Sequence, residues 1–237
     1  MPKALQRIFS LFIKPNPPRK RNGRKSRGQS LVEVAIAFPV FIMLLSGVIE
    51  FGFILNYYLS LLDATRDAAR VYSGGDPFLA DGVTDNDSQF YYQAAVLVRR
   101  TLDPSYNPLT NTFDAAYRGR RIVLDPKTDD VIVTVYGAGA SGVVLWRDAG
   151  PYYLPFPPYV DADRTNTPKH YPSIFTTTNI TSSRVTGAPD AGILVVEVHY
   201  NYHHILGLPW MAAILPNPLH LQAYTIMPIR AGEPVTP

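Results

Sequence analysis

The longest apolar stretch of this 237-residue chain lies near its N-terminus. Residues 34–49 (VAIAFPVFIMLLSGVI) carry no charge, and after Glu50 the apolar run resumes as far as Leu62. A bilayer core takes about 20 helical residues, and this run exceeds that length. The apolar region of a cleaved secretory signal is roughly 7–15 residues long and ends at an A-x-A site, which is missing here. We therefore predict a transmembrane helix rather than a cleaved signal or a buried core helix.

The helical pattern continues beyond the apolar run. Apolar residues keep helical spacing as far as Gly74-Gly75, where a C-terminal stop is expected: Leu61, Leu62, Ala64, Ala68, Ala69, Val71 and Tyr72. Pro39 lies inside the span, where it removes one backbone hydrogen bond, and membrane helices tolerate such a residue. We predict one helix over residues 29–74, kinked at Pro39, which passes from the membrane into a domain.

The rest of the chain predicts a mixture of one helix and several strands. Ser88 to Arg100 (SQFYYQAAVLVRR) favours a second helix after a polar, turn-rich stretch. Short runs rich in β-branched and aromatic residues then predict strands. They are 121–124 and 131–136, which flank DPKTDD as a hairpin, then 143–146, 193–202 and the final LQAYTIMPIR. The expected fold class is α+β, with a long N-terminal transmembrane helix that continues into a small antiparallel-sheet domain.

Residues 151–172 (PYYLPFPPYVDADRTNTPKHYP) form a separate feature within this domain. Their proline density argues against regular structure, and their aromatic side chains suit contact with a partner. The alternative is a long surface insertion packed by its own tyrosines. The sequence leaves both interpretations open.

The charge of the chain is concentrated at one end. Nine of its 22 basic residues fall within residues 1–28, which contain no acidic residue. The remaining 13 basic and 19 acidic residues give residues 29–237 a formal charge of −6, which argues against binding nucleic acid. Under the positive-inside rule, the basic leader stays in the cytoplasm and the C-terminal domain lies outside the inner membrane.

Two carboxylates mark the ends of the membrane span. Glu33 and Glu50 are 17 residues apart, which is about 26 Å along a helix and close to the thickness of a bilayer core. They are separated by about 260° around the helix axis, so they cannot form one site. This geometry excludes a paired-carboxylate catalytic centre in the span.

The leader, the carboxylate and the apolar helix together carry a resemblance. The stretch RKSRG ending at Gly28, then Gln29 to Glu33 (QSLVE), resembles the type IV prepilin cleavage motif, and residues 24–75 resemble TadE/TadF/TadG-like proteins of Tad pilus assembly. The resemblance implies a pilin-like fold and cleavage by a prepilin peptidase between Gly28 and Gln29. It also implies that Glu33, fifth in the mature chain, pairs with the N-terminal amine of a neighbouring subunit.

Two departures bear on the kind of subunit. Val34 stands where major Flp-type pilins usually have Tyr, and Gln29 stands where many type IV pilins have Phe. About 160 residues follow the helix, whereas Flp-type major pilins are very short. The resemblance thus implies a non-enzymatic pseudopilin or minor pilin, with three parts: a leader (1–28), a helix (29–74) and an extracytoplasmic domain (75–237).

The implied partners are the prepilin peptidase, other pilus or pseudopilin subunits, the inner-membrane assembly platform and membrane lipid. The protein would be a single-pass inner-membrane protein, and its incorporation into a surface pilus stays open. An uncleaved single-span envelope protein is the alternative, and N-terminal processing distinguishes the two.

Little in the sequence favours an enzyme. The chain has no cysteine, and the serine hydrolase, zinc protease and phosphate-loop motifs are absent. His199 and His203 would share a strand face with Glu197 and are weak candidates for a metal site. The alternative is that these residues occupy the solvent-facing side of a half-buried strand. We expect no cofactor.

Overall fold

A computed structural model describes the polypeptide in seven stretches: residues 27–77, 87–110, 112–139, 142–145, 151–154, 169–180 and 192–229. The basic leader up to residue 26 and the middle of the proline-rich stretch, residues 155–168, lie outside the described residues. The chain divides into two compact units, Met1–Ser46 and Gly47–Pro237. The three-part division expected from the sequence stays a prediction.

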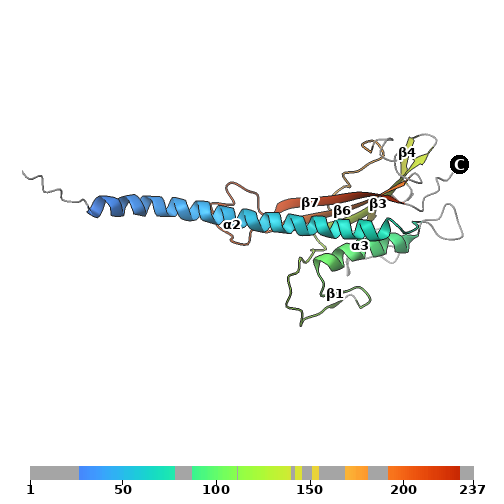
Figure 1. Ribbon diagram of the computed structural model, residues 1–237, viewed down its shortest axis with the longest axis horizontal. Helices are drawn as coiled ribbons and strands as arrows, with labels where there is room; N and C mark the ends of the chain where they lie inside the picture. The colour runs from blue at the N-terminus through green and yellow to red at the C-terminus, as the bar shows by residue number, and fades with distance from the viewer. Residues whose placement is uncertain are drawn as a thin grey trace, which may run out of the picture. The chain divides into compact units, whose positions relative to one another are not determined.

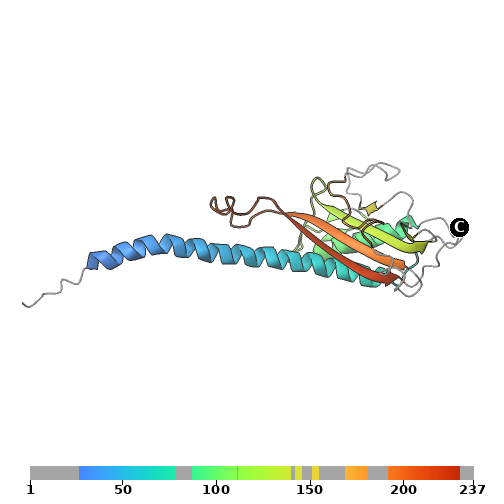
Figure 2. The same ribbon diagram turned by 90° about the horizontal axis from the view of Figure 1, so that it is seen from above.

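Helix α2 (Arg27–Tyr72) is the longest element, with 46 residues (Figures 1 and 2). Pro39 lies within it without ending it, and the expected kink stays a prediction. The helix ends where the sequence predicts its end. The Ser73 N–H still donates to the Ala69 carbonyl at 2.8 Å, and the Gly75 N–H then donates to the Tyr72 carbonyl in a tighter turn. The predicted single long helix is confirmed.

Helix α3 (Ser88–Leu102) confirms the second predicted helix. The Asp87 carboxylate accepts a hydrogen bond from the Gln89 N–H at 2.8 Å, which satisfies one of the unpaired donors of the first turn. At the other end, the Asp103 N–H reaches the Arg99 carbonyl at 2.8 Å. Arg99 and Arg100 occupy the last turn, where positive charge suits the helix dipole.

The main sheet is antiparallel, with strand order β4-β3-β6-β7, and the short β5 pairs with β3 beside β4 (Figure 1). A separate two-stranded sheet joins β1 and β2. The strands are β1 (Tyr106–Asn107), β2 (Thr112–Phe113), β3 (Asp130–Gly139), β4 (Gly142–Leu145), β5 (Tyr152–Tyr153), β6 (Gly192–Tyr202) and β7 (Leu219–Ile229). The α+β class is confirmed.

The hairpin predicted around DPKTDD is wrong in one arm. Residues 121–124 do not form a strand. The Ile122 N–H donates instead to the Leu102 carbonyl at the end of α3. The DPKTDD turn itself forms, since the Asp125 carboxylate accepts from the Lys127 N–H at 2.9 Å. The segment is apolar because Ile122 and Leu124 are buried in the core, and such a run reads like a strand in the sequence.

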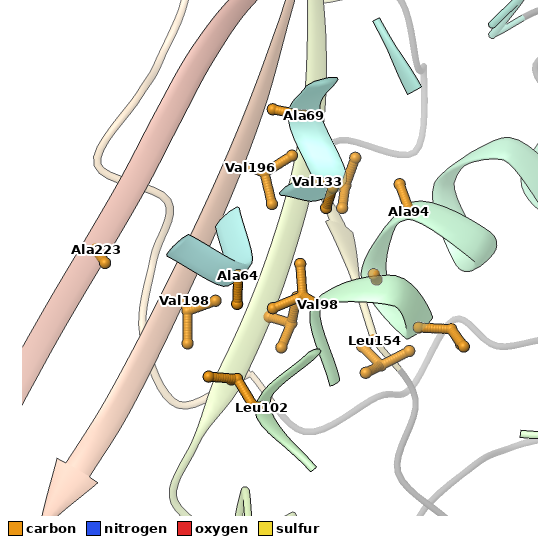
Figure 3. Close-up of a cluster of buried hydrophobic side chains, with 14 of the residues drawn as sticks. Ala64, Ala69, Ala94, Val98, Leu102, Val133, Leu154, Val196, Val198 and Ala223 are labelled. Atoms are coloured by element: carbon orange, nitrogen blue, oxygen red, sulfur yellow. The ribbon is translucent and has the colours of Figure 1, made fainter. Parts of the chain in front are cut away.

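The core lies between the sheet and the two helices. Figure 3 shows Ala64 and Ala69 of α2 facing the valines of β6, with Val98 and Leu102 of α3 beside them. Helix α2 also contacts β7 through a 2.9 Å hydrogen bond between the hydroxyls of Thr65 and Thr225.

The opposite face of the sheet is covered by residues 169–180. The Asp130 carboxylate accepts from the His170 and Tyr171 N–H groups at 2.8 and 2.7 Å. Further along this segment, the Glu197 carboxylate accepts from the Ser173 hydroxyl and from the Ile174 N–H. Strand β6 is therefore buried on both faces.

Candidate anchoring and assembly sites

The residues of the predicted cleavage and assembly site all lie in the first turns of α2. Gly28 and Glu33 are exposed, and Gln29 is helical. A side chain added at Gly28 would meet no atom within 4 Å. Gly28 is thus free of packing constraints from the described residues.

Glu33 also borders a shallow hollow on one face of α2. Its other lining residues are Ile36, Ala37, Val40, Phe41 and Leu44. These positions follow the three- and four-residue spacing of one helix face, so the carboxylate stands at the N-terminal end of an apolar strip. Such a strip suits contact with a second apolar helix.

The apolar part of α2 is exposed, unlike a core helix. Among the described residues, one helix, Ser30–Tyr72, is long and apolar enough to cross a membrane, and its most apolar stretch of 18 residues has a mean hydropathy of 2.4. Leu31 and Val48 each expose 70% of their surface. This exposure disfavours the alternative of a buried core helix.

Glu50 interrupts this exposed surface because the C-terminal domain covers it completely. Its carboxylate accepts three hydrogen bonds: from the Tyr202 hydroxyl at 2.6 Å and from the Ile205 and Leu206 N–H groups at 2.9 and 3.0 Å. We call these four residues the Glu50 clamp. Hydrogen bonds to an ionised acceptor are roughly twice as strong as those between neutral groups, so the clamp ties the end of β6 firmly to α2.

The local sequence around the clamp explains how the chain reaches Glu50. Strand β6 ends at Tyr202, whose ring packs edge-on against Tyr57 of α2 with the centroids 5.1 Å apart. The chain then turns at Gly207, whose φ of +57° disfavours any residue with a side chain. Burial and the hydrogen bond to Glu50 raise the pKa of Tyr202, so its hydroxyl stays a proton donor.

The sequence predicted Glu50 to mark the outer end of the membrane span, and its clamp was missed. A buried carboxylate needs several donors, and an acidic residue inside an apolar helix is the signal for such a partner. The donors stand more than 150 positions further along the chain, however, and two of them are backbone groups. No residue pattern identifies them.

The histidine candidates do not come together as expected. His199 is buried in β6, whereas His203 is exposed and follows the strand. The ring of His199 instead faces His220 of β7, with Nδ1 of His199 and Nε2 of His220 3.1 Å apart, and Tyr171 stacks on both rings. Burial and the neighbouring His199 ring lower the pKa of His220.

The expected solvent-facing side of β6 is therefore wrong for Glu197 and His199. Residues 169–180 cover that face. The alternating pattern of β6 is the same whether its polar face meets solvent or a covering loop, so the sequence does not separate the two cases. In the described stretches, no group of three or more His, Cys, Asp or Glu side chains could hold a metal ion.

The described ends of the proline-rich stretch pack onto the sheet. Tyr152 and Tyr153 form β5, and both are buried. Tyr153 donates its hydroxyl proton to the Tyr171 carbonyl at 2.9 Å, so residues from the two ends of the stretch contact each other. These ends fit an insertion packed by its own tyrosines, and residues 155–168 lie outside the description.

The comparison with protein families adds one finding to this geometry. A family model described as TadE-like protein matches residues 28–70, while neither curated proteins nor solved structures gave a match. The matched range begins at Gly28, includes Glu33, Pro39 and Glu50, and confirms the resemblance inferred from the sequence. Residues 28–70 of this chain are therefore similar to TadE-like proteins.

Proposed function

We propose that this protein is a non-enzymatic pseudopilin or minor pilin of Tad pilus assembly, anchored by α2 and processed after Gly28. The observation that carries the proposal is the TadE-like match, which starts at Gly28 and extends to residue 70 of α2. TadE-like proteins are structural components of pilus assembly, which supports a role without catalysis.

The charge distribution supports an orientation with the leader inside. Nine basic residues precede the span, and the rest of the chain is acidic, so the N-terminus stays in the cytoplasm and the C-terminal domain is exported. The flanking Arg27 holds the scissile bond at the cytoplasmic membrane surface, where a prepilin peptidase acts. Other pilus subunits and the inner-membrane assembly platform are the proposed partners.

N-terminal sequencing of the protein from native membranes, beside a strain with an inactive peptidase, tests the processing step. A start at Gln29 that disappears in the inactive strain supports the proposal. An intact leader in both strains indicates the alternative, an uncleaved single-span anchor. Gly28→Ala should also block cleavage without affecting folding, because the added methyl group meets no atom, and Gly52→Ala is a matched control in the same helix.

A second experiment tests the assembly role of Glu33. An unpaired carboxylate within a bundle of apolar helices is costly, so pairing with the Gln29 amine of a neighbour would select the correct register between subunits. We expect Glu33→Ala to block assembly while processing and folding stay normal, because the side chain is exposed. Val34→Ala, at the adjacent exposed position, serves as the control, and normal assembly of Glu33→Ala would refute the pairing role.

A further inference from the structure

The loop between β6 and β7, residues 203–218 (HHILGLPWMAAILPNP), has an unusual surface. It contains no Asp, Glu, Lys or Arg. Ile205 and Ile214 nevertheless expose 49% and 68% of their surface, and Leu206 exposes 37%. Exposed apolar side chains gathered in one uncharged loop mark an interaction surface rather than ordinary solvent-facing protein.

The position of the loop identifies what it contacts. The Glu50 clamp holds Ile205 and Leu206 against α2. Further along the loop, Cη2 of Trp210 lies 3.7 Å from where a side chain at Gly47 would begin. Gly47 precedes Glu50 by three residues, so between Leu206 and Trp210 the loop advances about 4.5 Å along the helix into its apolar part. The loop lies beside α2, beyond the ends of its strands (Figures 1 and 2).

The backbone of the loop is suited to an apolar environment. Besides the two N–H groups that bond to Glu50, the Met211 N–H reaches the Leu208 carbonyl, and the Ile214 and Leu215 N–H groups reach the Met211 carbonyl, at 2.8–3.0 Å. Pro209, Pro216 and Pro218 have no N–H to satisfy. Unsatisfied backbone donors are the main cost of placing a loop near lipid, and this loop meets much of that requirement internally.

From these observations we infer that the β6–β7 loop inserts into the outer interface of the bilayer, beside α2. The inference rests on the proposed membrane insertion of that helix. With Glu33 and Glu50 near the two membrane faces, Trp210 lies about one helical turn inside the outer face. Interfacial segments bury their apolar side chains about 5–10 Å into the boundary between headgroups and acyl chains, and tryptophan favours that depth. The Glu50 clamp then fixes how deeply α2 and the loop enter the bilayer.

The full-length protein in phosphatidylcholine vesicles provides the test. Trp146→Phe leaves Trp210 as the one tryptophan of the chain, and its fluorescence is compared in vesicles whose acyl chains carry bromine near the headgroup or near the terminal methyl group. We expect loss of Trp210 emission, larger with bromine near the headgroup. Ile214→Asp should weaken this quenching, whereas Leu109→Asp, at a position that is 94% exposed on the domain, should not.

Resistance to alkaline carbonate extraction reports insertion of α2 independently. Unquenched Trp210 in carbonate-resistant protein would overturn the loop inference while leaving the membrane anchor intact. Release of the protein by carbonate would remove the anchor and the inference together. Quenching that disappears as the ratio of protein to lipid rises would show that a second protein copy covers the loop, which also overturns the inference.

Discussion

Tyr202 donates its hydroxyl proton to the Glu50 carboxylate over 2.6 Å, although 152 positions separate the two residues in the chain. The bond joins the end of a central strand to a helix that the sequence assigns to the membrane. Glu50 is the one carboxylate between Glu33 and Asp63, and the bond supplies it with a buried hydrogen-bond donor. Lipid acyl chains would offer it no donor.

Replacing Glu50 should be among the most destabilising single changes outside the apolar core. Glu50→Ala leaves the Tyr202 hydroxyl and two backbone N–H groups without their acceptor, and we expect a loss of about 3 kcal/mol in the free energy of unfolding. Urea unfolding in detergent, followed by fluorescence, measures it. Glu33→Ala is the control and should leave the free energy unchanged, because that side chain is exposed.

A double-mutant cycle isolates the bond itself. Tyr202→Phe keeps the ring against Tyr57 and removes only the hydroxyl, so its coupling to Glu50→Ala should be about 1.5–3 kcal/mol, the range for a hydrogen bond to a charged group. Strictly additive effects of the two substitutions would show that the bond contributes nothing to stability.

The turn at Gly207 supplies a backbone prediction. An alanine at φ +57° places its Cβ close to the following carbonyl, so Gly207→Ala should cost about 1–2 kcal/mol in the free energy of unfolding, although no neighbouring atom obstructs the methyl group. Gly52→Ala adds the same methyl group to an open helical position and should not destabilise the protein. Equal effects of the two substitutions would contradict the backbone explanation.

The stacked histidines predict a pH dependence. Burial and His199 lower the pKa of His220, so around pH 6 the unfolded chain binds more protons at this site than the folded one. The contribution of His220 is therefore present above the ordinary histidine pKa of about 6.5 and is lost as the pH falls below it. Unfolding curves between pH 7.5 and 5 should show a smaller loss of stability for His220→Gln than for the unchanged protein. A parallel pH dependence of the two proteins would exclude this site as its source.

The attachment of residues 169–180 depends on Asp130. Asp130→Asn removes the charge that accepts the His170 and Tyr171 N–H groups, and we expect a loss of about 1–3 kcal/mol together with faster hydrogen exchange at these two amides. Asp114→Asn is the matched control, because Asp114 accepts a comparable bond from the Ala116 N–H at an exposed turn. Unchanged exchange at Tyr171 would contradict the proposed attachment.

The sequence predicted the elements with a local signature. The end of α2 at Tyr72, just before Gly74-Gly75, the start of α3 at Ser88 and the long strands β6 and β7 follow from periodicity and capping residues. It did not predict which segment covers which face. Ile122 and Leu124 resemble a strand because burial near α3 and burial in a sheet select the same side chains, and the covering of His199 depends on Tyr171, 28 positions away in the chain.

The order of the elements along the chain has a consequence for biosynthesis. Of the described elements, helix α2 is made first, and β6 and β7, which share a core cluster with Leu61, Ala64 and Ala68, are made last. Under the proposed topology, Leu61, Ala64 and Ala68 lack the cover of β6 and β7 until residue 229 has been translated and exported, and exposed apolar surface of this kind invites aggregation. If the domain is exported as proposed, we expect a nascent chain to depend on the membrane, or on a holdase in the envelope, until β6 and β7 have been made.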